Sequence, residues 1–170
     1  MFDPDNGGGP AQAHSERPNR SSISFPATAS QVTWARQFLE NLLTDSPLAA
    51  SAVLCLSEVA TNSVIHSNSR CEGGCFTVNV ERYDNGRVRV EVEDQGGPWI
   101  QRAKPEGQLS LGLRIVGQLA SEWGIKGTSD SARTVWFEVS PARSPAQAAA
   151  KQFPGAKALI RVTGHEQPAR

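Results

Sequence analysis

Residues 56–66 read LSEVATNSVIH and place Glu58, Asn62 and His66 four residues apart in a largely apolar stretch. Four residues of an α-helix turn through about 400°, so the three side chains would form one polar line along its side. The apolar residues between them predict that this line borders a face buried in the core. A carboxylate, a carboxamide and an imidazole can supply a base, an oxygen ligand for Mg²⁺ and a phosphate contact. An ordinary polar edge of a helix would show the same pattern. This segment alone therefore predicts a helix but does not decide between a binding site and a polar edge.

Residues 88–94 read VRVEVED, alternate between apolar and polar side chains, and run into Gln-Gly-Gly-Pro. The alternation predicts a strand that ends on the carboxylate of Asp94. Gly96 and Gly97 leave room for a flat ring against the backbone, and the carboxylate can accept a hydrogen bond from an exocyclic amine such as that of adenine. The alternative is an ordinary turn that begins at Asp94.

Residues 110–120 read SLGLRIVGQLA, with apolar residues at helical spacing, and predict a short helix. Unpaired N–H groups and the positive dipole end make the start of a helix an anion site, and Gly112 would permit close approach of a phosphate. Alternatively, Ser110 is simply the N-cap and Gly112 is a tolerated helix glycine.

In this order, the three segments resemble the N box, G1 box and G2 box of the ATPase superfamily of type II topoisomerases, histidine kinases and certain chaperones, often called the Bergerat fold. The N-box pattern of Glu, Asn and His at four-residue spacing is most similar to the bacterial anti-sigma factor serine/threonine kinases. Trp123-Gly124 and residues 134–138, TVWFE, also fit that branch. The resemblance extends over about residues 22–140.

The resemblance implies a role for each matching residue. Asn62 would ligate a Mg²⁺ ion that bridges the phosphates of ATP, and Glu58 would orient or deprotonate the attacking hydroxyl or water. Asp94 would bind the adenine amine. His66 would contact phosphate or cap its own helix. The other implied cofactor-binding residues are Gly96 and Gly97 in the purine pocket, Ser110, Gly112 and Leu113 at the phosphates, and Thr134, which would support Asp94 or a bridging water.

Two positions depart from the family pattern: Pro98 stands where the G1 box usually has a second glycine, and Ser110 replaces the first glycine of the G2 box. Residues 95–109 between the two boxes predict a long loop, which is typical of a lid over a binding site. Arg102 and Lys104 on this loop would contact phosphates on closure or remain solvated.

The predicted fold is α+β, a two-layer sandwich with helices on one face of a mixed, mostly antiparallel sheet. Residues 1–21 and 142–170 are predicted to be disordered tails around an ATP-binding domain at 22–141, because both ends have little apolar periodicity. The supporting predictions are an edge strand at Ile23 and Phe25, a helix over 31–43 capped by Ser30, a helix from Pro47 to about Ser67, a hairpin of 76–83 with 87–94 across Asn85-Gly86, and a last strand over 133–140.

The 17 basic and 17 acidic residues cancel, so charge does not favour nucleic acid or an anionic membrane as a partner. The absence of a long apolar run and of a signal peptide predicts a cytoplasmic location. Three cysteines, an odd number, fit a reducing compartment. A zinc site on His66, Cys71 and Cys75 is a minor alternative, because their spacing is irregular.

The leading functional prediction is an ATP- and Mg²⁺-dependent serine/threonine protein kinase. It would bind a sigma factor and phosphorylate an anti-anti-sigma factor. A homodimer is a further expectation that the sequence leaves open. A base at Glu58 together with a metal ligand at Asn62 is more than nucleotide binding alone requires. The alternative is a binding module, gated by nucleotide or independent of it, that sequesters a transcription regulator without phosphate transfer. Pro98 and Ser110 favour this alternative.

Overall fold

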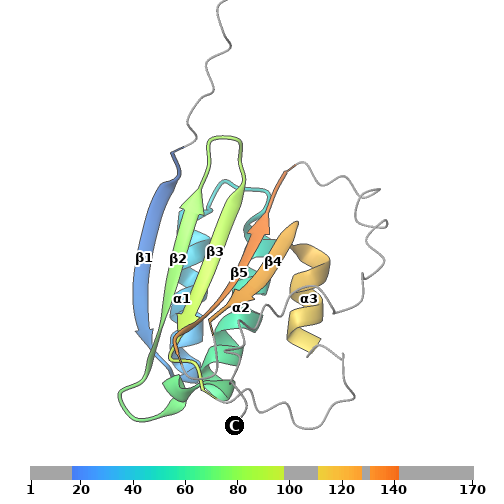
Figure 1. Cartoon of the computed structure of the whole chain (residues 1–170). Helices are drawn as coiled ribbons and strands as arrows, with labels where there is room; N and C mark the ends of the chain where they lie inside the picture. The colour runs from blue at the N-terminus through green and yellow to red at the C-terminus, as the bar shows by residue number, and fades with distance from the viewer. Residues whose placement is uncertain (1–16, 98–110, 128–130, 142–170) are drawn as a thin grey trace, which may run out of the picture.

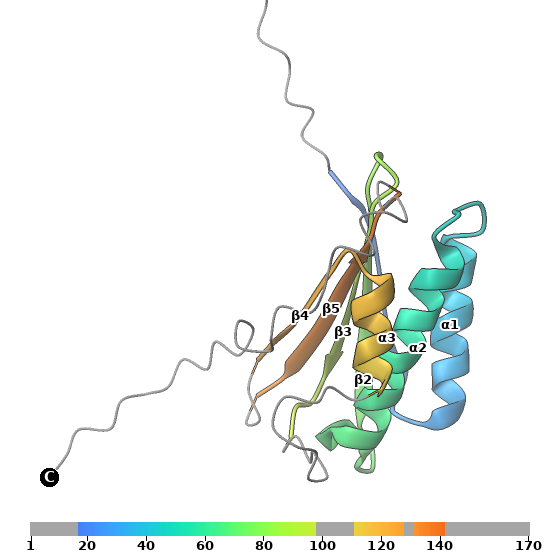
Figure 2. The same ribbon diagram turned by 90° about the vertical axis from the view of Figure 1, so that its right-hand side faces the viewer.

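The computed structural model describes residues 17–97, 111–127 and 131–141 of the 170-residue chain. These residues form two layers, a five-stranded sheet and a layer of three α-helices (Figure 1). In the view turned by 90°, the helices lie together on one face of the sheet (Figure 2). The predicted α+β sandwich is therefore confirmed.

The strand order in the sheet is β1-β2-β3-β5-β4, and each neighbouring pair is antiparallel. The sheet is thus antiparallel throughout its described strands and not mixed. The predicted hairpin joins β2 to β3, but only Gly86 of its turn has a positive φ, at 80°. The strands are β1 (Asn19–Pro26), β2 (Cys75–Arg82), β3 (Val88–Asp94), β4 (Glu122–Lys126) and β5 (Arg133–Val139).

Strand β1 is an edge strand, as predicted, but it begins at Asn19. Residues 19–21, which the sequence assigned to the N-terminal tail, pair with residues 80–82 of β2. Strand β4 has no counterpart among the strands predicted from sequence. It is short, and Gly124 interrupts its apolar pattern, which explains why alternation did not reveal it.

The helices are α1 (Ala29–Leu42), α2 (Ala49–His66) and α3 (Leu111–Leu119), and a 3₁₀ turn, η1 (Asn68–Arg70), follows α2. Helix α1 begins at Ala29, so Ser30 lies inside the first turn and is not its N-cap. Thr28, in extended conformation, is the N-cap, and its side chain makes no capping hydrogen bond. The predicted helix boundaries elsewhere differ from the observed ones by only a few residues.

Helix α2 is the centre of the helical layer, since it packs against α1 and α3 and also contacts β2, β3 and β5. Its position explains why the segment is apolar around most of its circumference. Burial of each large apolar side chain contributes about 1.5–3 kcal/mol to folding. The fully buried side chains come from both layers and include Leu39, Leu56, Val59, Val78, Val80, Val90, Val92, Val116 and Phe137.

In the described ranges, no helix has the length and apolar character needed to cross a lipid bilayer.

Candidate functional site

The polar line predicted on the N-box segment lies on α2. Glu58 and Asn62 are half-buried and His66 is exposed. Within the described part of the chain, these three side chains form no hydrogen bond or ion pair. Their polar atoms are therefore available to a ligand or to solvent.

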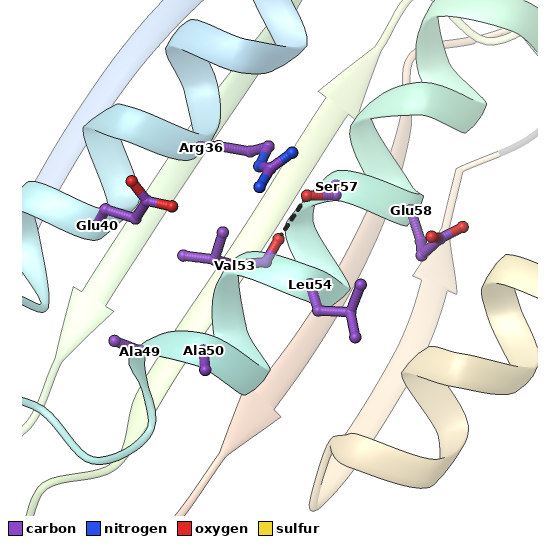
Figure 3. A pocket seen from close by; sticks show the side chains of 8 residues that line it. All are labelled: Arg36, Glu40, Ala49, Ala50, Val53, Leu54, Ser57 and Glu58. Atoms are coloured by element: carbon purple, nitrogen blue, oxygen red, sulfur yellow. Dashed lines mark hydrogen bonds between the residues drawn. The ribbon is translucent and has the colours of Figure 1, made fainter.

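The carboxylate of Glu58 lies against the start of α3. A methyl group on Gly112, the second residue of α3, would be 2.5 Å from Oε2 of Glu58 and 3.3 Å from its Cβ. Figure 3 shows the Glu58 side chain directed from α2 toward the neighbouring helix. The absence of a side chain at Gly112 thus lets a carboxylate approach the positive end of a helix.

The loop after β3 is bonded to the turn after α2. The N–H of Asn68 donates to the carbonyl of Gly96 at 2.7 Å, and the N–H of Gln95 donates to Oγ of Ser69 at 3.0 Å. Gly96 and Gly97 have φ values of 63° and 105°, which favour glycine. The end of β3 is therefore held beside the C-terminal end of α2.

The end of α2 is stabilised by Ser67 and not by His66. The Ser67 hydroxyl donates to the carbonyl of Ser63 at 2.6 Å and accepts from the N–H of Ser69 at 3.0 Å. The alternative in which His66 caps its helix is therefore not realised. In the described ranges no three His, Cys, Asp or Glu side chains are arranged to hold a metal, so the minor zinc alternative on His66, Cys71 and Cys75 is also wrong.

Asp94 ends β3, as predicted, but its carboxylate is engaged by a residue that the sequence analysis did not single out. Arg133 donates to Oδ2 of Asp94 from Nη2 at 2.7 Å and from Nε at 3.3 Å. The N–H of Gly96 donates to Oδ1 at 2.9 Å. The side chains of Asp94 and Arg133 are only 1% and 7% exposed. The position expected to bind an adenine amine thus holds a buried ion pair.

Strand alternation could have identified Arg133. Val135 and Phe137 on β5 are buried, so Arg133, two residues before Val135, must face the helices as well. Asp94 faces the same layer and stands opposite Arg133 in the β3–β5 register. What the sequence lacked was the pairing of these two strands.

The same register places Thr134 opposite Glu93, on the sheet face that points away from the helices. Adjacent residues of a strand point to opposite faces, so Thr134 points away from Asp94 here. The role of Thr134 beside Asp94 or at a bridging water stays a prediction. Leu113 is buried in the core, so only its backbone could approach a phosphate. Ser110, Pro98, Arg102 and Lys104 lie outside the described residues, as does the loop beyond Gly97.

Comparison with known proteins places this arrangement in a family, since the model of the histidine kinase-like ATPase domain matches residues 25–139. The chain belongs to the histidine kinase-like ATPase domain family. This confirms the superfamily to which the sequence motifs pointed. A search of curated proteins finds no match.

Two solved structures share the fold of this ATPase domain. The first contains the RsbU and RsbW domains of Rv1364c from Mycobacterium tuberculosis, with a TM-score of 0.55 and 22% identity over 72% of this chain and 32% of that one. This chain thus spans about a third of that protein. The second is the SiaB–SiaC complex from Pseudomonas aeruginosa, with a TM-score of 0.54 and 15% identity over 73% of this chain and 90% of the other.

A hollow of about 540 Å³ lies on the solvent side of α1 and α2 (Figure 3). Glu58 is at its edge, but Asn62, Asp94 and Gly112 do not line it. Of the three motif segments, only the N-box segment therefore contributes to this hollow, through Ser57 and Glu58. Its lining residues are Arg36, Glu40, Ala49, Ala50, Val53, Leu54, Ser57 and Glu58.

The residues of the ATPase domain fit a metal held between protein and phosphate. Mg²⁺ is commonly bound by one or two protein oxygens together with water and phosphate oxygens, so a cage of acidic residues is not required. Among the residues that the structure describes, the Asn62 carboxamide has no hydrogen-bond partner, and it lies on the same side of α2 as Glu58. At the other end of the site, the Asp94 carboxylate fits a nucleobase amine in type, but in this conformation it is paired with Arg133.

The cysteine beside Glu58 provides a test of how tightly α2 is packed. Burial, with a contribution from the negative charge of Glu58, raises the pKa of the Cys55 thiol to about 12. Only the thiolate reacts rapidly with alkylating reagents, so at pH 8 Cys55 should react at least about 100-fold more slowly than the exposed Cys71. Peptide mapping by mass spectrometry measures the two rates. In denaturant they should become similar; equal rates in the folded protein would contradict the packing of α2.

Proposed function

We propose that this domain binds ATP with Mg²⁺ and acts as a serine/threonine protein kinase of the anti-sigma factor type. It would bind a sigma factor and phosphorylate an anti-anti-sigma protein. The observation that carries this proposal is that the Glu58 carboxylate lies beside Gly112 at the start of α3. Glu58 is on α2, the helix that also carries Asn62. A base, a metal ligand and an anion-binding helix end would then surround one point.

Each residue would have a distinct task. Asn62 would hold the metal ion, and the first N–H groups of α3 would bind phosphate oxygens close to Gly112. Glu58 would orient the substrate hydroxyl and accept its proton as the nucleophile attacks. Asp94 would accept a hydrogen bond from the adenine amine, with the backbone of Gly96 and Gly97 beside the ring. ATP would supply the phosphoryl group, and the protein would supply position and charge.

The two neighbouring folds support a role in protein interaction. One structure contains an RsbW domain together with an RsbU domain, and the other is a complex between SiaB and SiaC. A sigma factor and an anti-anti-sigma factor as partners, a cytoplasmic location and a possible homodimer all belong to the proposal.

Replacement of Glu58 by glutamine should separate transfer of phosphate from binding of nucleotide. The amide keeps the shape of the side chain but cannot take a proton, so transfer should fall by about 10²–10⁴-fold while nucleotide affinity changes little. Radiolabelled ATP, Mg²⁺ and candidate anti-anti-sigma proteins would measure transfer, and calorimetry would measure affinity. Glu93→Gln, on the exposed outer face of β3, is the matched control. Failure of the wild-type protein to transfer phosphate to any candidate would count against a kinase.

A second candidate function is the binding module without phosphate transfer, and the ion pair between Asp94 and Arg133 favours it. If the carboxylate serves only the fold, the domain could bind a regulator with no nucleotide at all. Calorimetry of the wild type and Asp94→Asn with ATP and Mg²⁺ distinguishes the cases. Binding by the wild type that is lost in Asp94→Asn supports a nucleotide site, whereas no binding by either protein supports the module.

Replacement of Gly112 by alanine should disturb the site without harming the fold. The added methyl group would lie 2.5 Å from Oε2 of Glu58, so the carboxylate must move away. Alanine has a better helix propensity than glycine, by about 1 kcal/mol, which offsets the crowding. We expect phosphate transfer to drop about tenfold or more with little change in the urea midpoint. Gly117→Ala, on the same helix, is the control, because its methyl group would meet only Trp123, at 3.4 Å. An active Gly112→Ala protein would argue against a role for Glu58.

A further inference from the structure

The ion pair between Arg133 and Asp94 occupies Oδ2 of the carboxylate through which the aspartate would recognise a base. Oδ2 receives two hydrogen bonds from one guanidinium, and Oδ1 receives one from the N–H of Gly96. With its side chain 1% exposed, Asp94 cannot be reached from solvent in this conformation. A ligand that needs this carboxylate must first move the group that holds it.

Arg133 is the movable member of this arrangement. The hydrogen bond from Gly96 is donated by backbone that is itself hydrogen-bonded to Asn68. The hydrogen bonds from Arg133 are donated by the end of a long side chain, which can change rotamer. A guanidinium is a stronger partner for a buried carboxylate than a neutral amine, because its hydrogen bonds are charge-assisted. An adenine amine would therefore not share the carboxylate on equal terms and would have to displace the guanidinium.

We propose that Arg133 is the gate of the base-binding position: it closes the position by pairing with Asp94, and nucleotide binds when its guanidinium leaves the carboxylate. The proposal rests on the proposed nucleotide-binding function. It adds a specific residue that sets affinity. If the state that can bind nucleotide is a minor one, the apparent dissociation constant equals the intrinsic dissociation constant divided by the fraction of molecules in that state.

The test is calorimetric titration of the protein with AMP and with a non-hydrolysable ATP analogue plus Mg²⁺. For Arg133→Ala we expect both ligands to bind at least about tenfold more tightly than to the wild type, which corresponds to a gate open about a tenth of the time or less. The gain should be similar for the two ligands, because the gate acts on the base and not on the phosphates.

Two further variants make the test decisive. Arg133→Gln keeps a neutral donor beside Asp94, so it should fold even if Arg133→Ala does not, and it should show a smaller gain. Arg89→Ala is the matched control: Arg89 bridges β3 to β5 through Glu138 at 2.9 Å on the outer sheet face, away from Asp94. It should bind both ligands with wild-type affinity.

The possible outcomes separate the gate from the function on which it rests. If the wild type binds and the Arg133 variants bind equally or more weakly, the gate is overturned and the nucleotide site stands. If neither the wild type nor the variants bind, both proposals are overturned. If only the Arg133 variants bind measurably, the gate is supported in its strongest form.

Discussion

Replacing Asn62 with alanine is expected to weaken Mg²⁺-dependent nucleotide binding and phosphate transfer by at least about 100-fold. The side chain is half-buried on α2 and, among the described residues, makes no hydrogen bond of its own, so its removal costs the fold little. In the described ranges no cluster of acidic or histidine side chains could take over the metal. A metal that loses its protein ligand can no longer join the phosphates to α2, and such contributions are worth several kcal/mol.

The measurement is a titration of nucleotide at several Mg²⁺ concentrations. In the wild type, affinity should rise with Mg²⁺; in Asn62→Ala it should be low and nearly independent of the metal. Thr61→Ala is a suitable control, since Thr61 is the exposed neighbour on the same helix. An Asn62→Ala protein with a wild-type response to Mg²⁺ would remove the metal site from the proposal.

Replacing Asp94 with alanine is expected to destabilise the domain by about 3–5 kcal/mol, because it removes the carboxylate that is paired with the buried guanidinium of Arg133. For a domain of this size, the melting temperature should fall by about 10–20 °C. Urea unfolding should show the same loss of about 3–5 kcal/mol in the free energy of unfolding, and the slope of that free energy against urea concentration should not change.

Arg20→Ala is the contrasting control for this prediction. It breaks an ion pair with Glu81 at 2.9 Å, but Arg20 is 74% exposed, so the cost should be at most about 1 kcal/mol. The double variant Asp94→Ala with Arg133→Ala should be less destabilised than the sum of the single variants, since no unpaired charge remains. A strictly additive result would show that the two side chains do not stabilise each other.

Local pattern was sufficient for most of the architecture. The helical spacing in residues 56–66 and the alternation in residues 88–94 each report burial within a few neighbouring residues, and both segments adopt the expected structure. The placement of Glu58, Asn62 and His66 on one helix follows from the same local periodicity. Where the local signal is short or broken, as in β4 and at the start of β1, prediction from sequence failed.

The contacts of the candidate site were decided by tertiary structure. Whether Arg133 or Thr134 meets Asp94 depends on the register of β5 against β3, and a shift of one residue exchanges the two faces. The docking of Gly96 on Asn68 and of Gly112 on Glu58 likewise joins segments distant in the chain. The sequence by itself determined the helices and every strand except β4, together with the polar groups that they carry, because these features depend on residues close in the chain. Only the folded chain decided that the aspartate is paired with an arginine, because that contact arises from packing between distant segments.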